Sequence, residues 1–264
     1  MVLRFSIVFA AIVVCCTATA GAGAHPVPAL SRVGDGPKQA PFDARSREAV
    51  ANFYQAAYLP SDSVATGWEG VPEHCDPGTV SRAFEQATLE RINYFRAMAG
   101  VPPLSGLHDD YNQGAQQAAL MMSVNQRLDH NPDESWTCYT EEGDLAAGSS
   151  NLYLGRSGPS AIDGYVDDEG EHNYPVGHRR WILYPQTEQM GTGDVPWTNG
   201  YPAVNALWVF DDMMSGPRPE TRDGFVAWPP PGYVPYQVVY RRWSFSYPQA
   251  DFSETVITMT IAGA

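Results

Sequence analysis

The stretch TVSRAFEQATLERINYFRAMAG, from Thr79 to Gly100, does most to decide the fold of this chain. Either Thr79 or Ser81 can cap a helix, and Gly100 is a typical residue at which one ends. Between them, apolar residues recur with approximately helical spacing, so the stretch predicts an amphipathic helix. The residues of its apolar stripe are Phe84, Leu89, Ile92, Phe95 and Met98.

Three further helices are predicted around this one. Residues 109–128 begin with two aspartates that suit the positive end of a helix dipole, and their apolar residues share one face. Residues 45–59 suit a short helix, and residues 157–168 suit another that begins near Pro159. In residues 45–59 the apolar face comprises Val50, Phe53, Tyr54 and Ala57. In residues 109–128 it comprises Tyr111, Ala115, Ala118 and Met122.

The second half of the chain changes character and favours strands. It contains runs rich in Val, Ile, Tyr, Trp and Phe, separated by Gly and Pro. These runs are residues 179–185, 201–210, 236–247 and 254–261. Helices early and strands late predict an α+β fold, in which a sheet packs against helices.

The first 24 residues have the features of a secretory signal peptide. Arg4 precedes an apolar core that is too short to span a bilayer comfortably, and either Ala20 or Ala24 fits the cleavage pattern. No other segment is long and apolar enough to suggest a membrane span. We therefore expect a secreted, extracellular protein with no stable membrane insertion.

The charge of the chain argues against nucleic acid as a partner. Its 264 residues carry a formal net charge of −14, and removal of residues 1–24 takes away one cation and no acid. An acidic surface repels phosphate backbones and anionic lipids. The partner is therefore expected to be another macromolecule or a lipid ligand.

Two cysteines, Cys75 and Cys138, remain after the predicted signal peptide. In an oxidising compartment two cysteines most simply pair with each other, although two buried free thiols are the alternative. We expect a disulfide bond between them.

Five segments, taken together and in order, resemble the CAP superfamily (cysteine-rich secretory, antigen 5 and pathogenesis-related 1 proteins, with an SCP-like extracellular domain). The resemblance covers approximately residues 80–195 and implies an α-β-α sandwich. The segments are ERINYFRAMAGVPPLSGL (90–107), DDYNQGAQQAALMM (109–122), LDH (128–130), GSSNLYLG (148–155) and AIDGYVDDEGEHNYPVGHRRWIL (161–183).

The resemblance also implies a cavity lined by two histidines and two acids. His130 and His178 match the histidines, with His178 at the start of a central strand. One acid belongs to a Gly-Glu-Asn motif, where this chain has Ser150 before Asn151. Asp168 matches the other acid, and the alignment can also slip onto Glu169 or Glu171. The expected cavity-lining residues are therefore His130, Ser150, Asn151, Asp168 and His178.

Three functions remain open from these residues. The first is a secreted, non-catalytic binding module whose cavity binds a divalent metal such as Zn²⁺ through His130 and His178. The second, implied by the resemblance, is binding of a sterol or another lipid. The third is a metal-dependent hydrolase using His130, His178 and Asp168, although hydrolytic zinc usually has a third protein ligand.

The same reasoning divides the chain into four parts. Residues 1–24 form the signal peptide, and residues 25–78 form an N-terminal linker, rich in Pro and Gly at its start, followed by the short helix. Residues 79–215 are expected to form the CAP-like domain. Residues 216–264 are expected to form a β-rich C-terminal extension.

Overall fold

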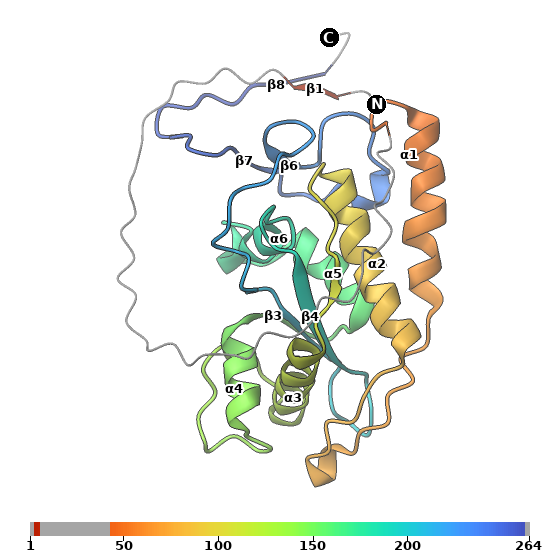
Figure 1. Ribbon diagram of the computed structural model, residues 1–264, viewed down its shortest axis with the longest axis vertical. Helices are drawn as coiled ribbons and strands as arrows, with labels where there is room; N and C mark the ends of the chain where they lie inside the picture. The colour runs from red at the N-terminus through yellow and green to blue at the C-terminus, as the bar shows by residue number, and fades with distance from the viewer. Residues whose placement is uncertain (1–2, 6–42, 262–264) are drawn as a thin grey trace.

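A computed structural model describes residues 3–5 and 43–261 of the chain (Figure 1). At its centre is a four-stranded sheet in the order β2-β4-β5-β3. β2 runs parallel to β4, whereas β5 is antiparallel to both β4 and β3. The strands are β2 (Gly106–Leu107), β3 (Ser150–Leu154), β4 (Gln189–Val195) and β5 (Val204–Trp208).

Helices cover both faces of this sheet, so the predicted α-β-α sandwich is confirmed. α3 (Asp109–Asn125) and α4 (Glu141–Gly148) pack on one face (Figure 1). α2 (Arg82–Met98) and α5 (Gly158–Asp167) pack against each other over the other core.

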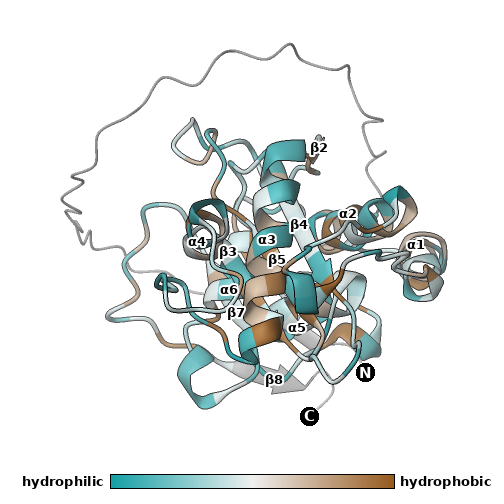
Figure 2. Cartoon of the chain, turned by 90° about the horizontal axis from the view of Figure 1, so that it is seen from below, coloured by the Kyte–Doolittle hydropathy of each residue, from teal (hydrophilic) through white to brown (hydrophobic). Residues whose placement is uncertain are grey.

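The side chains of β5 show how one strand serves two cores. Val204 and Ala206 point into the core formed with α3 and α4, whereas Leu207, together with Val209 directly after the strand, belongs to the core formed with α2 and α5. This alternation follows from the two-residue period of a strand. Hydrophobic segments accordingly gather around β5 in the middle of the molecule (Figure 2).

The helices agree well with the sequence pattern. Ser81, rather than Thr79, caps α2, because its hydroxyl accepts a hydrogen bond from the Phe84 N–H. α1 (Arg47–Phe53) continues through a π-helical turn, Tyr54–Tyr58, and a 3₁₀ turn, Leu59–Ser63. The expected apolar face of this segment does pack against the core with α2.

The prediction of a strand over residues 179–185 is wrong. These residues lie mostly in a helix, α6 (Gly177–Ile182). His178 therefore lies in the first turn of this helix instead of at the mouth of a central strand. Arg179 and Ile182, three positions apart, are the buried residues of α6, which is a helical spacing.

The C-terminal extension carries a small sheet, as expected, but less β-structure than its sequence suggested. β6 (Val226–Trp228) pairs with β7 (Ser244–Ser246), which lies within the run 236–247 expected to favour a strand. Only the end of that run is a strand, because Tyr236–Val238 at its start forms a 3₁₀ turn. The Trp228 ring packs 5.1 Å from the ring of Phe95 in α2. The extension therefore shares the core of the sandwich.

A further strand, β8 (Met259–Ile261), pairs with β1 (Leu3–Phe5). β1 falls within the predicted signal peptide, and the rest of that segment lies outside the described residues, as does the predicted linker up to residue 42. None of the helices within the described ranges has the length and apolar character needed to cross a membrane.

The predicted disulfide bond between Cys75 and Cys138 is confirmed. It links the segment before α2 to the loop between α3 and α4. A closed loop of 63 residues stabilises the fold by about 4 kcal/mol in the chain-entropy picture.

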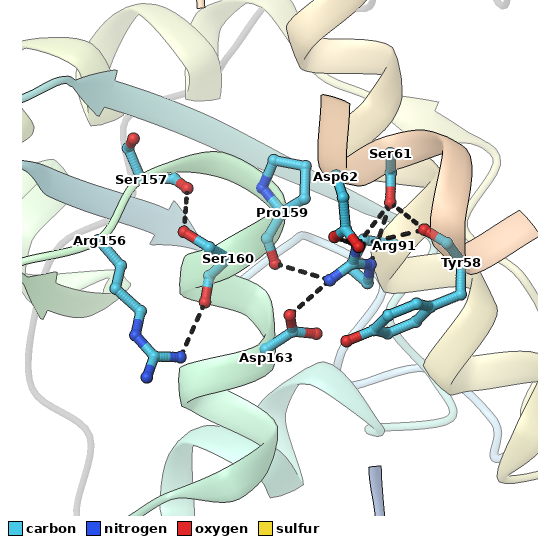
Figure 3. Close-up of polar contacts among 9 residues, drawn as sticks. All are labelled: Tyr58, Ser61, Asp62, Arg91, Arg156, Ser157, Pro159, Ser160 and Asp163. Atoms are coloured by element: carbon cyan, nitrogen blue, oxygen red, sulfur yellow. Dashed lines mark hydrogen bonds and ion pairs between the residues drawn. The ribbon is translucent and has the colours of Figure 1, made fainter. Parts of the chain in front are cut away.

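A buried arginine joins three separate parts of the chain (Figure 3). The Arg91 side chain from α2 is fully buried; its Nη1 donates to Asp163 of α5 at 2.5 Å, and its Nη2 pairs with Asp62. Arg91 also donates to the Ser61 hydroxyl and lies 3.6 Å from the centre of the Tyr58 ring. This cluster fixes the end of the N-terminal helical segment to α2 and α5.

Candidate functional site

A cavity of about 340 Å³ opens where β3, α6 and the loop after α3 meet. The expected residues His130, Ser150, Asn151 and His178 all line it. The remaining lining residues are Gly148, His172, Asn173, Pro175, Gly177, Trp181, Val209 and Phe210.

His178 is held on this wall by a carboxylate behind it. Its Nδ1 lies 2.8 Å from Oδ1 of Asp168, and its side chain is 28% exposed. Asp168 is the residue that ends α5, in a left-handed conformation with φ of 55°. Its second oxygen, Oδ2, accepts from the Arg179 N–H at 3.3 Å, so both oxygens of the carboxylate are engaged by α6.

His130 reaches the same cavity from the loop that follows α3. Its Nδ1 lies 2.8 Å from the carbonyl oxygen of Ala147, near the end of α4. The contact therefore ties the loop after α3 to the helix that leads into β3.

The two contacts favour the same neutral tautomer in both imidazole rings. A carbonyl oxygen and a carboxylate are acceptors, so Nδ1 carries the proton in each ring. The lone pair of each neutral ring is then on Nε2. His130 and His178 both line the cavity, and in each of them Nε2 is the nitrogen available to a ligand.

The comparisons with known proteins identify this part of the chain. Residues 89–211, which contain every residue that lines the cavity, match the model of the cysteine-rich secretory protein family, CAP. These residues form a CAP domain. A comparison with curated proteins finds no match for the chain.

Ser150 gives the CAP domain an unusual feature at the position where the resemblance implies an acid. The residue is 5% exposed, and its Oγ is buried with no hydrogen-bond partner among the described residues. Buried hydroxyl groups usually have a hydrogen-bond partner. The Ser150 oxygen is therefore available to accept a hydrogen bond from a ligand.

Asn151 has a positioning role in the same strand. Its Nδ2 donates to the carbonyl oxygen of His178 at 3.0 Å, so it ties β3 to the first turn of α6. The Tyr165 hydroxyl from α5 donates either to the carbonyl oxygen of Asn151 at 2.9 Å or to Asn205, whose carbonyl oxygen and Oδ1 are within 3.0 Å. This buried network fixes Asn151, which lines the CAP cavity.

The acids of the CAP domain are placed differently from expectation. Asp168 was expected to line the cavity, but it lies behind His178 and is 2% exposed. Glu169 and Glu171 do not line the cavity either, and no residue of the described lining is an aspartate or glutamate. The cavity wall therefore presents imidazole, hydroxyl and amide groups.

A third histidine, His172, lines the cavity and was missed by the sequence analysis. It lies in a 3₁₀ turn, Glu171–Asn173, on the segment that connects α5 to α6. Within the part of the chain that the structure describes, no three His, Cys, Asp or Glu residues are grouped closely enough to hold a metal ion. A metal ion in this cavity would therefore have two protein ligands, the imidazoles of His130 and His178.

Proposed function

We propose that this CAP domain is a non-catalytic binding module that holds a divalent metal ion between His130 and His178. The observation that carries the proposal is that both rings face one cavity with Nδ1 engaged. Histidines that bind metals almost always donate their other ring N–H to a carboxylate or a backbone carbonyl. His178 has the first kind of partner and His130 the second.

Zn²⁺ suits this pair of donors better than a hard cation does. Neutral imidazole binds Zn²⁺ at about 2.0–2.1 Å, whereas Mg²⁺ and Ca²⁺ prefer oxygen ligands. Two protein ligands leave coordination positions for water or for a donor group of a partner molecule. The ion would then connect the CAP cavity to whatever the module binds.

The composition of the cavity wall supports binding over hydrolysis. Catalytic zinc usually has three protein ligands, and a carboxylate is one common base for the water that it binds. The described lining contains no carboxylate, and Asp168 is already used as the acceptor for His178. His178 cannot serve as a ligand and as the base through the same Nε2.

Secretion is part of the same proposal. The predicted signal peptide directs export, and the Cys75–Cys138 disulfide fits an oxidising compartment. N-terminal sequencing of protein collected from the culture medium of the producing cells tests this part. Protein that keeps residues 1–24 and stays inside the cell contradicts it.

Calorimetric titration of the purified protein with Zn²⁺ tests the metal site. We expect one equivalent to bind, and we expect His130→Ala and His178→Ala each to abolish binding while the fold is retained. His74→Ala is the control, because His74 is exposed and does not line the cavity. His172→Ala separates a two-histidine site, which it leaves intact, from a site that uses all three rings.

Unchanged zinc affinity in either His130→Ala or His178→Ala would contradict a shared site. Turnover of ester or peptide substrates by the zinc-loaded protein, lost in both variants, would instead favour the hydrolase.

A further inference from the structure

We infer that a second cavity, on the other side of α6, binds a small carboxylate with an aromatic body. This cavity has a volume of about 400 Å³ and lies between α6 and the small sheet of β6 and β7. Its size is in the range of sites for small organic ligands. Its inner surface combines aromatic side chains with three arginines.

The apolar part of the wall comes from both sides of the cavity. Trp181 and Tyr184 belong to α6 and the residues after it, whereas Trp228 and Phe245 come from β6 and β7. Trp228 is 1% exposed, and its indole N–H donates to the Val238 carbonyl at 3.0 Å, so this wall is fixed. Flat, rigid rings on opposite sides suit an aromatic body.

The cationic part of the wall consists of Arg179, Arg180 and Arg218. None of them forms an ion pair with a carboxylate of the described residues. The chain as a whole carries 30 acids against 16 Lys and Arg, so three neighbouring arginines that form no ion pair within the described residues are unusual here. Arg180 is exposed, but Arg179 is buried and Arg218 is half-buried, and charges in such positions are normally paired.

The guanidinium groups differ in how many hydrogen bonds their N–H groups donate to the rest of the chain. Arg179 is 1% exposed, and it donates to the carbonyl oxygens of Val166 and Arg242 and to the Ser244 hydroxyl. Its burial lowers its pKa to about 10, although Asp168 and Asp167 oppose this effect. Its donors are therefore occupied, and it contributes mainly charge.

Arg218 supplies the free donor. Its Nη2 is buried and has no hydrogen-bond partner among the described residues. An unmade hydrogen bond of a buried charged donor is costly. A carboxylate matches the planar fork of a guanidinium and would satisfy this group. A sterol hydroxyl can accept one hydrogen bond from Arg218, but it carries no charge that balances the guanidinium.

The two walls of the cavity come from different parts of the sequence. Residues 177–185 lie within the segment that matches the CAP family, whereas residues 218–246 follow it. The C-terminal extension therefore builds the site against α6. Gly177 and Trp181 line both cavities, so α6 separates the carboxylate site from the metal site.

Calorimetry with 2-naphthoate and its neutral analogue 2-naphthylmethanol tests the inference on the full protein. We expect one 2-naphthoate to bind, and 2-naphthylmethanol to bind at least about tenfold more weakly, because it lacks the charge that the arginines recognise. Arg218→Gln should weaken 2-naphthoate binding by a similar factor, and Arg218→Lys should restore part of it.

Two further variants locate the binding. Arg156→Gln removes an exposed arginine outside the cavity, and His130→Ala alters only the metal cavity; both should bind 2-naphthoate as the wild type does. Thermal unfolding checks that each variant is folded. Equal affinity for the charged and neutral compounds overturns the inference, as does an unaffected Arg218→Gln, an impaired His130→Ala or no binding at all.

Discussion

Asp168 Oδ1 lies 2.8 Å from His178 Nδ1, and this contact joins the end of α5 to the first turn of α6. It turns the imidazole so that the ring faces the cavity, and it places the proton on Nδ1. Asp168 therefore acts on a ligand only through His178.

Removal of this carboxylate should weaken zinc binding without abolishing it. We expect Asp168→Ala to lower the affinity for Zn²⁺ by about 10–100-fold, the usual effect of losing the partner of a metal-bound histidine. Asp168→Asn should bind more tightly than Asp168→Ala, because an amide oxygen can still accept from Nδ1–H and asparagine tolerates the left-handed backbone. Calorimetry measures both, and equal affinity of the two variants would argue that Asp168 has no positioning role.

Introduction of an acid at the Ser150 position should strengthen the metal site. Ser150 lines the cavity and its hydroxyl has no partner among the described residues. We expect Ser150→Glu to bind Zn²⁺ more tightly than the wild type, because a carboxylate adds a third ligand.

Ser149→Glu is the matched control for this change. Ser149 is half-buried, lies outside the cavity, and donates its hydroxyl proton to the Leu145 carbonyl. The Ser149→Glu substitution adds the same charge one residue away from Ser150, so we expect the zinc affinity to change little. A similar gain in both variants would indicate a general charge effect.

Truncation of the buried Arg91 side chain is expected to be costly for stability. Arg91→Ala leaves Asp163 largely buried without its ion-pair partner, so we expect a loss of about 3–5 kcal/mol in the free energy of unfolding. Arg156→Ala, which removes an exposed arginine from the same region (Figure 3), should cost less than about 0.5 kcal/mol. Urea denaturation measures both values, and similar losses would contradict the role of Arg91.

The buried Asp194 should make stability depend on pH. Burial raises its pKa, although hydrogen bonds from Gly158, Asn205 and Thr192 oppose the shift. The folded state therefore favours the protonated acid, and this contribution is complete below the ordinary pKa of 3.8 and is lost as the pH rises through the folded pKa.

Asp194→Asn removes this dependence. The stability of the variant relative to the wild type should be constant below about pH 3.8 and should rise as the pH increases above it. Urea denaturation at a series of pH values measures the difference. A constant difference over the whole range would contradict the raised pKa of Asp194.

The sequence predicted the longest helices best. α2 and α3 each bury an apolar stripe with helical spacing, and both carry recognisable start signals. Periodicity over this length is a strong guide to structure. The expected position of His130, in the loop after α3, follows from the same pattern.

α6 was misassigned as a strand because one of the two residues on its buried face is an arginine. Trp181, Ile182 and Leu183 form an apolar run that is typical of a strand. The helical stripe instead pairs Ile182 with Arg179, whose side chain is satisfied by carbonyl oxygens from distant parts of the chain. No local pattern marks such a residue as part of a core.

β4 was missed for the opposite reason, since its residues have little strand propensity. Gly191 and Gly193 face α3, where a Cβ on Gly193 would lie 2.0 Å from the backbone of Ala115. The glycines allow the helix to approach the strand closely. His172 was missed as well, because its place on the cavity wall depends on the path of the chain between α5 and α6.

The most direct test of the shared metal site is nitrogen NMR of the imidazole rings during titration with Zn²⁺. Protein labelled with ¹⁵N at histidine shows the Nδ1 and Nε2 resonances of each ring. We predict that the Nε2 resonances of His130 and His178 shift together and stop changing at one equivalent of zinc. Movement of only one ring, or a shift that identifies Nδ1 as the ligand, would contradict the account.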